Sequence, residues 1–260
     1  MKLETFSNYE SGDNKMKLYS AWYCPFAQRA WMALEHKGID FDYVEVDPYH
    51  KTEWWLEVSR GSTMVPVIVQ SDIVESSNRA EQSTVLDSNR ILEYLDDLYP
   101  QQTPIFSDKP GQRAEQKYWM DHIGNNITAY FYRYLKANKA GSAQDEALAK
   151  MMTGLASFAD AIHSQGPFFA GPEIDVVDIS MIPFAYRIKV LLEHYRNINL
   201  PTEGELWIRY HRWYNAMIES SAFKTTATDQ AGYRDKLVEF YLPYSVGGGQ
   251  SDVTSLRSVG

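Results

Sequence analysis

Short apolar segments alternate with longer periodic ones along the first hundred residues. Four short segments are rich in β-branched or aromatic residues and are predicted to be strands: 17–22, 41–46, 65–69 and 85–86. A polar loop over residues 70–84 is predicted to separate the last two strands. The pattern therefore predicts a small sheet in this part of the chain.

Helical periodicity fills the intervals between these strands. A helix is predicted over residues 25–37, because Pro25 suits a first helical turn and Gly38 suits a helix end. A short helix is predicted over residues 53–58. Asp87 is expected to cap a third helix, which carries apolar residues on one face. The predicted order is β-α-β-α-β-β-α.

The second part of the chain has only helical patterns. Three prolines within residues 99–111 indicate a boundary, so the predicted domains are residues 1–102 and 103–245. Four long helices are predicted in the second domain: 113–139, 143–164, 176–195 and 203–220. Asp175 and Asp178 are expected to form a capping box at the third of these helices. The glycine- and serine-rich segment 246–260 is predicted to be a disordered tail.

Composition is that of an ordinary globular protein, with 44% hydrophobic and 14% aromatic residues. The net charge is −9, and the first hundred residues contain 9 basic against 17 acidic side chains. Such an acidic surface makes nucleic acid and anionic membranes unsuitable partners. The chain begins without a secretory pattern, contains no apolar run of membrane-spanning length and has one cysteine, so a reducing, cytoplasmic location is expected.

The single cysteine, Cys24, lies between the first predicted strand and the first predicted helix. Unpaired N–H groups at a helix start favour a thiolate, so a lowered pKa and a nucleophilic sulfur are predicted. The alternative is a buried, inert thiol. Ala27 stands where a Cys-x-x-Cys motif has its second cysteine, so an intramolecular disulfide step is excluded. A thiol that cycles here needs an external partner such as glutathione.

Several motifs occur in a fitting order: Cys-Pro-Phe-Ala from Cys24, Glu53-Trp54, Val-Pro-Val from Val65, and an acidic residue with serine at Asp87-Ser88. A thioredoxin-like domain with these motifs, followed by an all-helical domain, resembles the soluble glutathione transferases, and within them the cysteine-type omega class. The resemblance covers about residues 16–240 and is strongest in the first hundred.

The resemblance implies glutathione as co-substrate, a mixed disulfide with Cys24 and a homodimer. The residues that it assigns to glutathione are Phe26, Lys51, Val65, Pro66, Asp87 and Ser88. Lys51 would pair with the glycine carboxylate and Val65 would offer its backbone N–H and C=O, with a cis peptide bond at Pro66. Asp87 would accept the γ-glutamyl ammonium and Ser88 would donate to the neighbouring carboxylate. Asp87 replaces the usual glutamate, which shortens this contact arm.

Other interpretations of these residues remain open. Pro66 would also suit the edge of a strand, and Lys51 would also suit a solvated surface position. Asp87 and Ser88 could act only as a helix cap. Aromatic residues of the helical domain are mostly expected in the core. A second-substrate pocket for aromatic molecules or S-glutathionylated substrates is nevertheless predicted from Tyr23, Tyr130, Tyr134 and Trp213. The six histidines lack metal-ligand spacing, so no metal is expected.

Three functions are compatible with the sequence. The first is an omega-like glutathione transferase that acts as a thiol transferase or a reductase of glutathionyl conjugates or dehydroascorbate through Cys24. The second is a non-catalytic, glutathione-sensitive binder of aromatic small molecules. The third, a relative of the chloride intracellular channel proteins, shares the Cys-Pro-Phe start, but residues 16–46 show no long apolar helix suited to insertion.

Overall fold

The computed structural model describes residues 15–74, 79–137 and 141–253. The first part of the chain forms β1 (Met16–Ser20), α1 (Pro25–Lys37), β2 (Phe41–Glu45), α2 (Glu53–Val58), β3 (Val67–Val74), β4 (Arg79–Leu86) and α3 (Ser88–Leu98). The second part forms α4 (Pro110–His122), the π-helix η1 (Ile123–Thr128), α5 (Ala129–Lys136), α6 (Ser142–Ala161), α7 (Val176–Arg196), α8 (Glu205–Glu219), α9 (Ser221–Thr226), α10 (Tyr233–Ser245) and α11 (Gln250–Val253). The predicted fold class, a thioredoxin-like domain followed by a helical domain, is confirmed.

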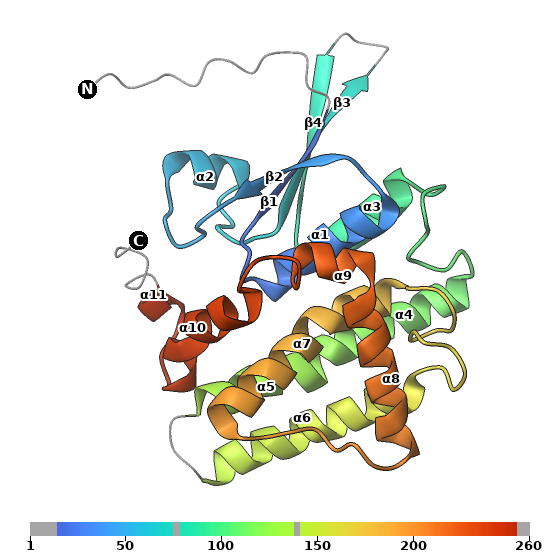
Figure 1. Ribbon diagram of the computed structural model, residues 1–260. Coiled ribbons are helices and arrows are strands. Elements are labelled where there is room, and N and C mark those ends of the chain that lie inside the picture. The colour runs from blue at the N-terminus through green and yellow to red at the C-terminus, as the bar shows by residue number, and fades with distance from the viewer. Residues whose placement is uncertain (1–14, 75–78, 138–140, 254–260) are drawn as a thin grey trace.

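The four described strands form one sheet in the order β2-β1-β3-β4. Strand β1 pairs with β2 in parallel, so that Leu18 lies opposite Tyr43, and with β3 in antiparallel orientation, so that Leu18 also lies opposite Ile68. Leu18 and Ile68 are fully buried, which fixes this register because a one-residue slip would expose both. Helix α1 and the helical domain lie below the sheet in Figure 1.

The hairpin of β3 and β4 corrects the prediction of a polar loop over residues 70–84. The two strands pair without interruption from Val67 opposite Leu86 to Val74 opposite Arg79. Ladder hydrogen bonds join backbone groups and do not require apolar side chains, so a polar segment can extend a hairpin beyond the core. Figure 1 shows this hairpin projecting past the rest of the sheet.

Helix α1 joins the two domains and sets the position of Cys24. It begins at Pro25 as predicted and ends at Gly38, whose φ of 66° is left-handed and suits glycine. Its buried face packs against α3, α7 and α9. Arg29, which is 3% exposed, donates from Nε to the carbonyl of Ser180 in α7 over 2.9 Å. The start of α1 is therefore held from both domains.

The predicted capping box of α7 is confirmed. Asp175 accepts the N–H groups of Val177 and Asp178, and Asp178 accepts the N–H of Asp175 over 2.9 Å. Asp178 is fully buried and also accepts from the backbone N–H of Phe169 and the indole N–H of Trp213. This carboxylate therefore connects α7 to α8 and to the preceding loop.

The remaining helices depart from the predictions in three ways. The helix predicted over residues 113–139 is divided by the π-helix η1, where helix α6 approaches closely. At that approach a Cβ on Gly154 would lie 2.4 Å from the carbonyl oxygen of Asn126, so only glycine fits. Helices α9 and α10 were not predicted. The prediction of a disordered tail from residue 246 is wrong for the segment up to residue 253, because α11 is formed there and Val253 is 2% exposed. Residues 254–260 lie outside the described residues.

Candidate functional site

Cys24 occupies the N-cap position of α1. Its own N–H donates to the carbonyl of Ala21 over 2.8 Å, and its carbonyl accepts the N–H of Gln28 over 3.0 Å. The backbone at Cys24 is extended, with φ −81° and ψ 117°, and the chain turns into the helix at Pro25. Cys24 is half-buried as a residue, and its thiol lies at the helix start, as predicted from the sequence.

The thiol lies beside the segment that the resemblance assigns to glutathione. Cys24 Sγ is 4.0 Å from the carbonyl oxygen of Val65, a long contact in which the thiol is the donor. The peptide bond between Val65 and Pro66 is cis, as expected. The structure therefore brings Cys24 and Val65 together, although they are 41 positions apart.

The prediction of a lowered thiol pKa is wrong. Burial is the largest influence and raises the pKa of Cys24, because a thiolate loses hydration there. The backbone N–H groups of Ala27 and Phe26 and the guanidinium groups of Arg187 and Arg29 oppose this shift. The expected effect of the helix start is thus present, but burial outweighs it.

A buried guanidinium lies behind the Cys24 segment. Arg187 in α7 is 0% exposed and donates to the carbonyl of Tyr23 over 2.9 Å and to Gln28 Oε1 over 2.8 Å. It also donates to the carbonyl of Pro183 and the hydroxyl of Tyr233. None of the four groups to which Arg187 donates is a carboxylate, so these hydrogen bonds do not neutralise its positive charge. Such a charge favours a thiolate at Cys24.

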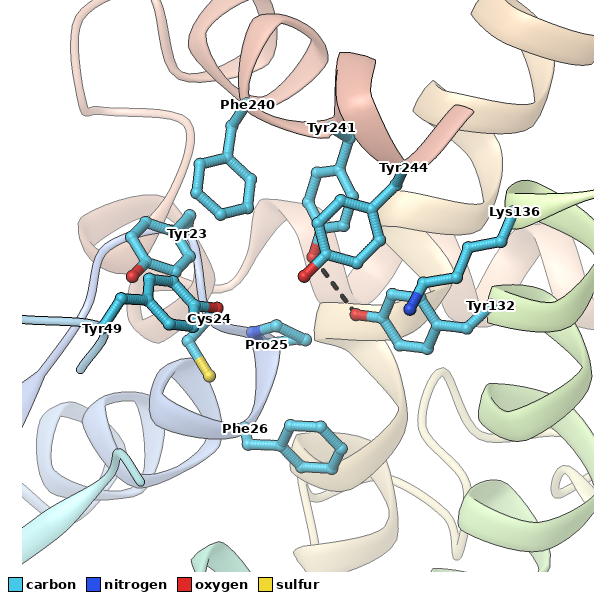
Figure 2. Close-up of a pocket in the computed structure, with 10 residues that line it drawn as sticks. All are labelled: Tyr23, Cys24, Pro25, Phe26, Tyr49, Tyr132, Lys136, Phe240, Tyr241 and Tyr244. Atoms are coloured by element: carbon cyan, nitrogen blue, oxygen red, sulfur yellow. Dashed lines mark hydrogen bonds between the residues drawn. The ribbon is translucent and has the colours of Figure 1, made fainter. Parts of the chain in front are cut away.

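A cavity of about 170 Å³ opens beside the thiol. The residues that line this Cys24 cavity, shown in Figure 2, are Tyr23, Cys24, Pro25, Phe26, Tyr49, Tyr132, Lys136, Phe240, Tyr241 and Tyr244. The rings of Tyr23 and Phe240 are stacked with centroids 3.9 Å apart, and the hydroxyl groups of Tyr132 and Tyr241 are 3.2 Å apart. The cavity is thus aromatic, with one ammonium group from Lys136.

The other predicted glutathione residues occupy three positions around α1. Phe26 is 39% exposed and lines the Cys24 cavity, with its ring 5.1 Å from that of Phe184. Asp87 is exposed and caps α3, accepting the N–H groups of residues 89 and 90. Ser88 is buried, and its Oγ is 3.5 Å from Nη1 of Arg29. Of the two assigned residues at the start of α3, Ser88 therefore contacts α1 through the Arg29 guanidinium.

Lys51 lies just before α2, whose first turn is capped by Thr52. Its side chain is exposed, and no contact between it and the Cys24 cavity is found in the described part of the chain. Its predicted role for glutathione remains a prediction.

The structure brings one of the four predicted second-substrate residues to the Cys24 cavity. Tyr23 lines the Cys24 cavity, but Tyr130, Tyr134 and Trp213 do not. Trp213 is 0% exposed and donates its indole N–H to Asp178 over 2.6 Å, which makes it a core residue. Tyr130 instead packs against the charged ends of Arg133 and Lys150, and Tyr134 is 7% exposed within the helical core.

Several lining residues were missed. Tyr132 lies between the two tyrosines that had been chosen on the same helix, and Phe240, Tyr241 and Tyr244 come from α10, which was not predicted. The spacing of Tyr130, Tyr132 and Tyr134 was the one available signal. Residues two positions apart lie about 200° apart around a helix, so Tyr132 points away from the other two tyrosines.

The described residues contain no group of three or more histidine, cysteine, aspartate or glutamate side chains placed to hold a metal ion. None of the helices in residues 15–74, 79–137 and 141–253 combines the length and apolar character needed to cross a bilayer.

Comparison with known proteins agrees with the fold. Residues 23–98 match the family model "Glutathione S-transferase, N-terminal domain", and residues 141–216 match "Glutathione S-transferase, C-terminal domain". The chain belongs to the glutathione S-transferase family.

Individual relatives and solved structures indicate which members of the family this chain resembles. The chain is 30% identical over 218 residues to "Glutathione S-transferase DHAR3, chloroplastic" of Arabidopsis thaliana, covering 83% of this chain and 74% of that protein. It is 26% identical to "Probable glutathione S-transferase DHAR1, cytosolic" of Oryza sativa subsp. japonica, covering 82% and 90%. Glutathione transferase Omega 3C from Trametes versicolor has a similar structure, with a TM-score of 0.69 and 29% identity over 82% of this chain and 89% of that one. The predicted omega-like character is confirmed.

Proposed function

We propose that this protein is a glutathione-dependent thiol transferase that works through a mixed disulfide on Cys24. The observation that supports this most directly is the placement of the chain's single thiol at the start of α1, beside the carbonyl of Val65. A thiol in this position can meet the sulfur of a peptide that pairs with the Val65 backbone.

The proposed reaction has two exchanges. The Cys24 thiolate attacks the glutathionyl sulfur of a mixed disulfide, forming a Cys24–glutathione disulfide and releasing the substrate as a thiolate. A second glutathione thiolate then attacks the glutathionyl sulfur, so glutathione disulfide leaves and Cys24 is restored. One free glutathione is consumed in each cycle, and it leaves joined to the substrate's glutathionyl group as glutathione disulfide. Reduction of a phenacyl-glutathione conjugate has the same balance, whereas reduction of dehydroascorbate consumes two free glutathione molecules, which supply the two electrons.

Glutathione is proposed to lie across the edge of the sheet. Val65 would pair with its cysteinyl unit, while Asp87 would accept its ammonium. Ser88, together with the N–H groups at the start of α3, would hold the γ-glutamyl carboxylate, and Lys51 would hold the glycine carboxylate. The chemistry suits a zwitterionic peptide because each charged end meets an opposite charge or an N–H donor.

The Cys24 cavity is the proposed place for the second substrate. Its aromatic walls and the Lys136 ammonium suit hydrophobic or aromatic compounds and S-glutathionylated molecules. A homodimer in the cytoplasm completes the proposal, with detoxification or deglutathionylation as its role. Relatives with the printed names "cytosolic" and "chloroplastic" both occur, so fractionation of the native protein is the direct test of its location.

The experiment is turnover of wild type and Cys24→Ser with the mixed disulfide of glutathione and 2-mercaptoethanol, and with dehydroascorbate. The variant should fall to the uncatalysed rate with both substrates while keeping the wild-type melting temperature, because serine is close in size and far less nucleophilic. Lys236→Glu serves as a matched control outside the Cys24 cavity and should keep the wild-type rate. A full rate in Cys24→Ser would contradict the proposal.

The alternative function is non-catalytic binding of aromatic molecules, favoured by the five tyrosine and two phenylalanine side chains around the Cys24 cavity. This alternative would be favoured if an aromatic compound bound tightly, if neither glutathione nor the Cys24 substitution changed its affinity, and if neither substrate were turned over.

A further inference from the structure

Gln28 lies about one helical turn after Cys24 on α1 and is almost fully buried. It is 2% exposed, and its backbone N–H donates to the carbonyl of Cys24 over 3.0 Å. Its side chain does not line the Cys24 cavity and takes no part in the exchanges proposed above. Burial of an amide is costly unless its hydrogen bonds are made, so the partners of this side chain indicate what it does.

The amide of Gln28 is hydrogen-bonded on both sides to the helical domain. Its Oε1 accepts from Arg187 Nη1 over 2.8 Å and from the Tyr233 hydroxyl over 3.3 Å. Its Nε2 donates to the hydroxyl of Thr226 over 3.3 Å. These partners belong to α7, α10 and α9, so the side chain connects the helix that begins beside Cys24 to three helices of the second domain.

Arg187 is the charged partner among them. Its guanidinium is fully buried, and Nη2 donates to the carbonyl of Tyr23, the residue directly before Cys24, over 2.9 Å. Arg187 takes part in no ion pair within residues 15–74, 79–137 and 141–253. Residue 28 is therefore the position at which a change from amide to carboxylate would give this guanidinium a counter-charge.

The titratable groups around the thiol leave the charge of Arg187 in place at neutral pH. Besides Arg187 they are Arg29 of α1, Tyr43 of β2, Tyr49 of the segment after β2, Tyr132 of α5 and Tyr241 of α10. Burial raises the pKa of all four tyrosines, so they are uncharged at neutral pH. The Asp87 carboxylate interacts with the charge of Arg29, whereas the strongest interactions of Arg187 are with tyrosines and the thiol.

We propose that Gln28 is a positioning residue for the reaction of Cys24, because its amide holds the Arg187 guanidinium beside the thiol without neutralising it. The buried guanidinium needs an oxygen acceptor at residue 28, and this acceptor must be neutral to leave the charge available to a thiolate. Glutamine meets both requirements, whereas glutamate meets only the first and leucine only the second. This role rests on the proposed function, since a larger thiolate fraction speeds attack on the glutathionyl sulfur.

The test is the rate of alkylation by iodoacetamide as a function of pH, together with thermal unfolding of the same variants. Gln28→Glu should keep the wild-type melting temperature, because its carboxylate accepts the same hydrogen bonds and the Thr226 hydroxyl can turn to donate to it. Its alkylation midpoint should rise by about one pH unit and its rate at neutral pH should fall about tenfold, because the guanidinium then has a counter-charge.

Gln28→Leu should have the opposite pair of effects. Its melting temperature should fall, because Arg187 loses an acceptor, while its alkylation midpoint should not rise, because no charge has been added. A merely structural role of residue 28 would change the midpoint and the melting temperature together or leave the midpoint unchanged in both variants.

Gln112→Glu is the matched control for the added charge. Gln112 is exposed on α4, outside the Cys24 cavity, and its Oε1 accepts from the Ser107 hydroxyl over 2.8 Å. The same substitution there keeps an acceptor and adds the same charge. It should leave both the alkylation midpoint and the melting temperature unchanged.

An unchanged midpoint in Gln28→Glu would overturn the proposal, and so would a rise of the same size in Gln112→Glu or in Gln28→Leu. Alkylation requires no glutathione, so these results are independent of the proposed function, which fails separately if the wild type does not turn over its substrates. Turnover of the mixed disulfide of glutathione and 2-mercaptoethanol should fall in Gln28→Glu by about the same factor as alkylation at neutral pH. A full turnover rate in that variant would contradict a role of Gln28 in the reaction.

Discussion

The Cys24 cavity and the Trp22 cavity are alike in their walls and unlike in their chemistry. The Trp22 cavity has a volume of about 560 Å³, and its lining residues are Trp22, Trp31, Tyr43, Glu45, Thr226, Gln230, Tyr233 and Lys236. Each is lined by aromatic rings and one lysine, Lys136 in the first and Lys236 in the second. The loop that precedes α1 contributes to both. Only the first contains a thiol, and Cys24 is the single cysteine of the chain. Binding of an aromatic compound to this protein therefore says nothing about turnover, whereas the reaction requires Cys24.

The buried charge also distinguishes the two cavities. Arg187 contacts the carbonyl of Tyr23 and the side chain of Gln28, next to the thiol, while its contact with Tyr233 reaches the wall of the Trp22 cavity. This side chain thus supports both sites, and its charge favours the thiolate in the one that contains Cys24.

The largest effect is expected from Arg187→Met. Loss of the guanidinium removes the hydrogen bonds that it donates to Gln28 Oε1, to the carbonyl oxygens of Tyr23 and Pro183 and to the Tyr233 hydroxyl, which should lower the free energy of unfolding by about 3 kcal/mol. It should also slow alkylation of Cys24 at neutral pH, because a charge that favours the thiolate is gone. Urea unfolding and iodoacetamide kinetics measure the two effects.

Arg187→Lys is the control for that substitution. It keeps a positive charge with fewer donors, so stability should fall while alkylation slows less than in the methionine variant. Unchanged stability and unchanged thiol reactivity in Arg187→Met would contradict the role given to this residue.

The second prediction concerns the pH dependence of the thiol. The pKa of Cys24 lies above its ordinary value because burial disfavours the thiolate, so less thiolate is present at neutral pH than in an exposed cysteine. The alkylation rate should therefore rise with pH through a midpoint above that of a model cysteine peptide, which is about 8.5. Lys236→Glu, at the other cavity, should leave this midpoint unchanged. A midpoint well below that of the peptide would contradict the account.

A third prediction separates capping from binding at Asp87. Asp87→Asn keeps a capping oxygen for α3 and loses the charge, so it should raise the KM for glutathione about tenfold with little change in stability. Asp87→Ala loses both and should also cost about 1 kcal/mol of stability. Steady-state kinetics and thermal unfolding give the two readouts. Equal KM values for wild type and Asp87→Asn would leave Asp87 as a helix cap alone.

The smallest effect is expected from the Tyr132–Tyr241 pair. Replacing either tyrosine with phenylalanine removes the 3.2 Å hydrogen bond between their hydroxyl groups and should cost about 1 kcal/mol or less. The double variant should cost little more than one single variant, since the two share one bond. A double-variant loss equal to the sum of the single losses would show that the hydroxyl groups act separately.

The sequence predicted one wall of the Cys24 cavity better than the other. Cys24 and Phe26 are neighbours in one motif, and Pro25 fixes a helix start whatever the rest of the chain does. The cis peptide bond at Pro66 followed from the family resemblance, because the residues around it alone also suit a strand edge.

The opposite wall could not be predicted in the same way. Its tyrosines come from α5 and α10, and their approach depends on how the helical domain packs. The π-helix before α5 offsets the helical phase, so a 3.6-residue pattern does not tell which of Tyr130, Tyr132 and Tyr134 faces the cavity. Trp213 was chosen for its aromatic ring, but its partner Asp178 is buried in the core, which no local pattern reveals.

The most direct test of the central claim is the intact mass of the protein after exposure to glutathione disulfide, and again after excess reduced glutathione is added. The account predicts one glutathionyl group on the wild type, its removal by reduced glutathione, and no adduct on Cys24→Ser. An unmodified wild type under conditions in which a model cysteine peptide is fully glutathionylated would contradict a mixed disulfide on Cys24.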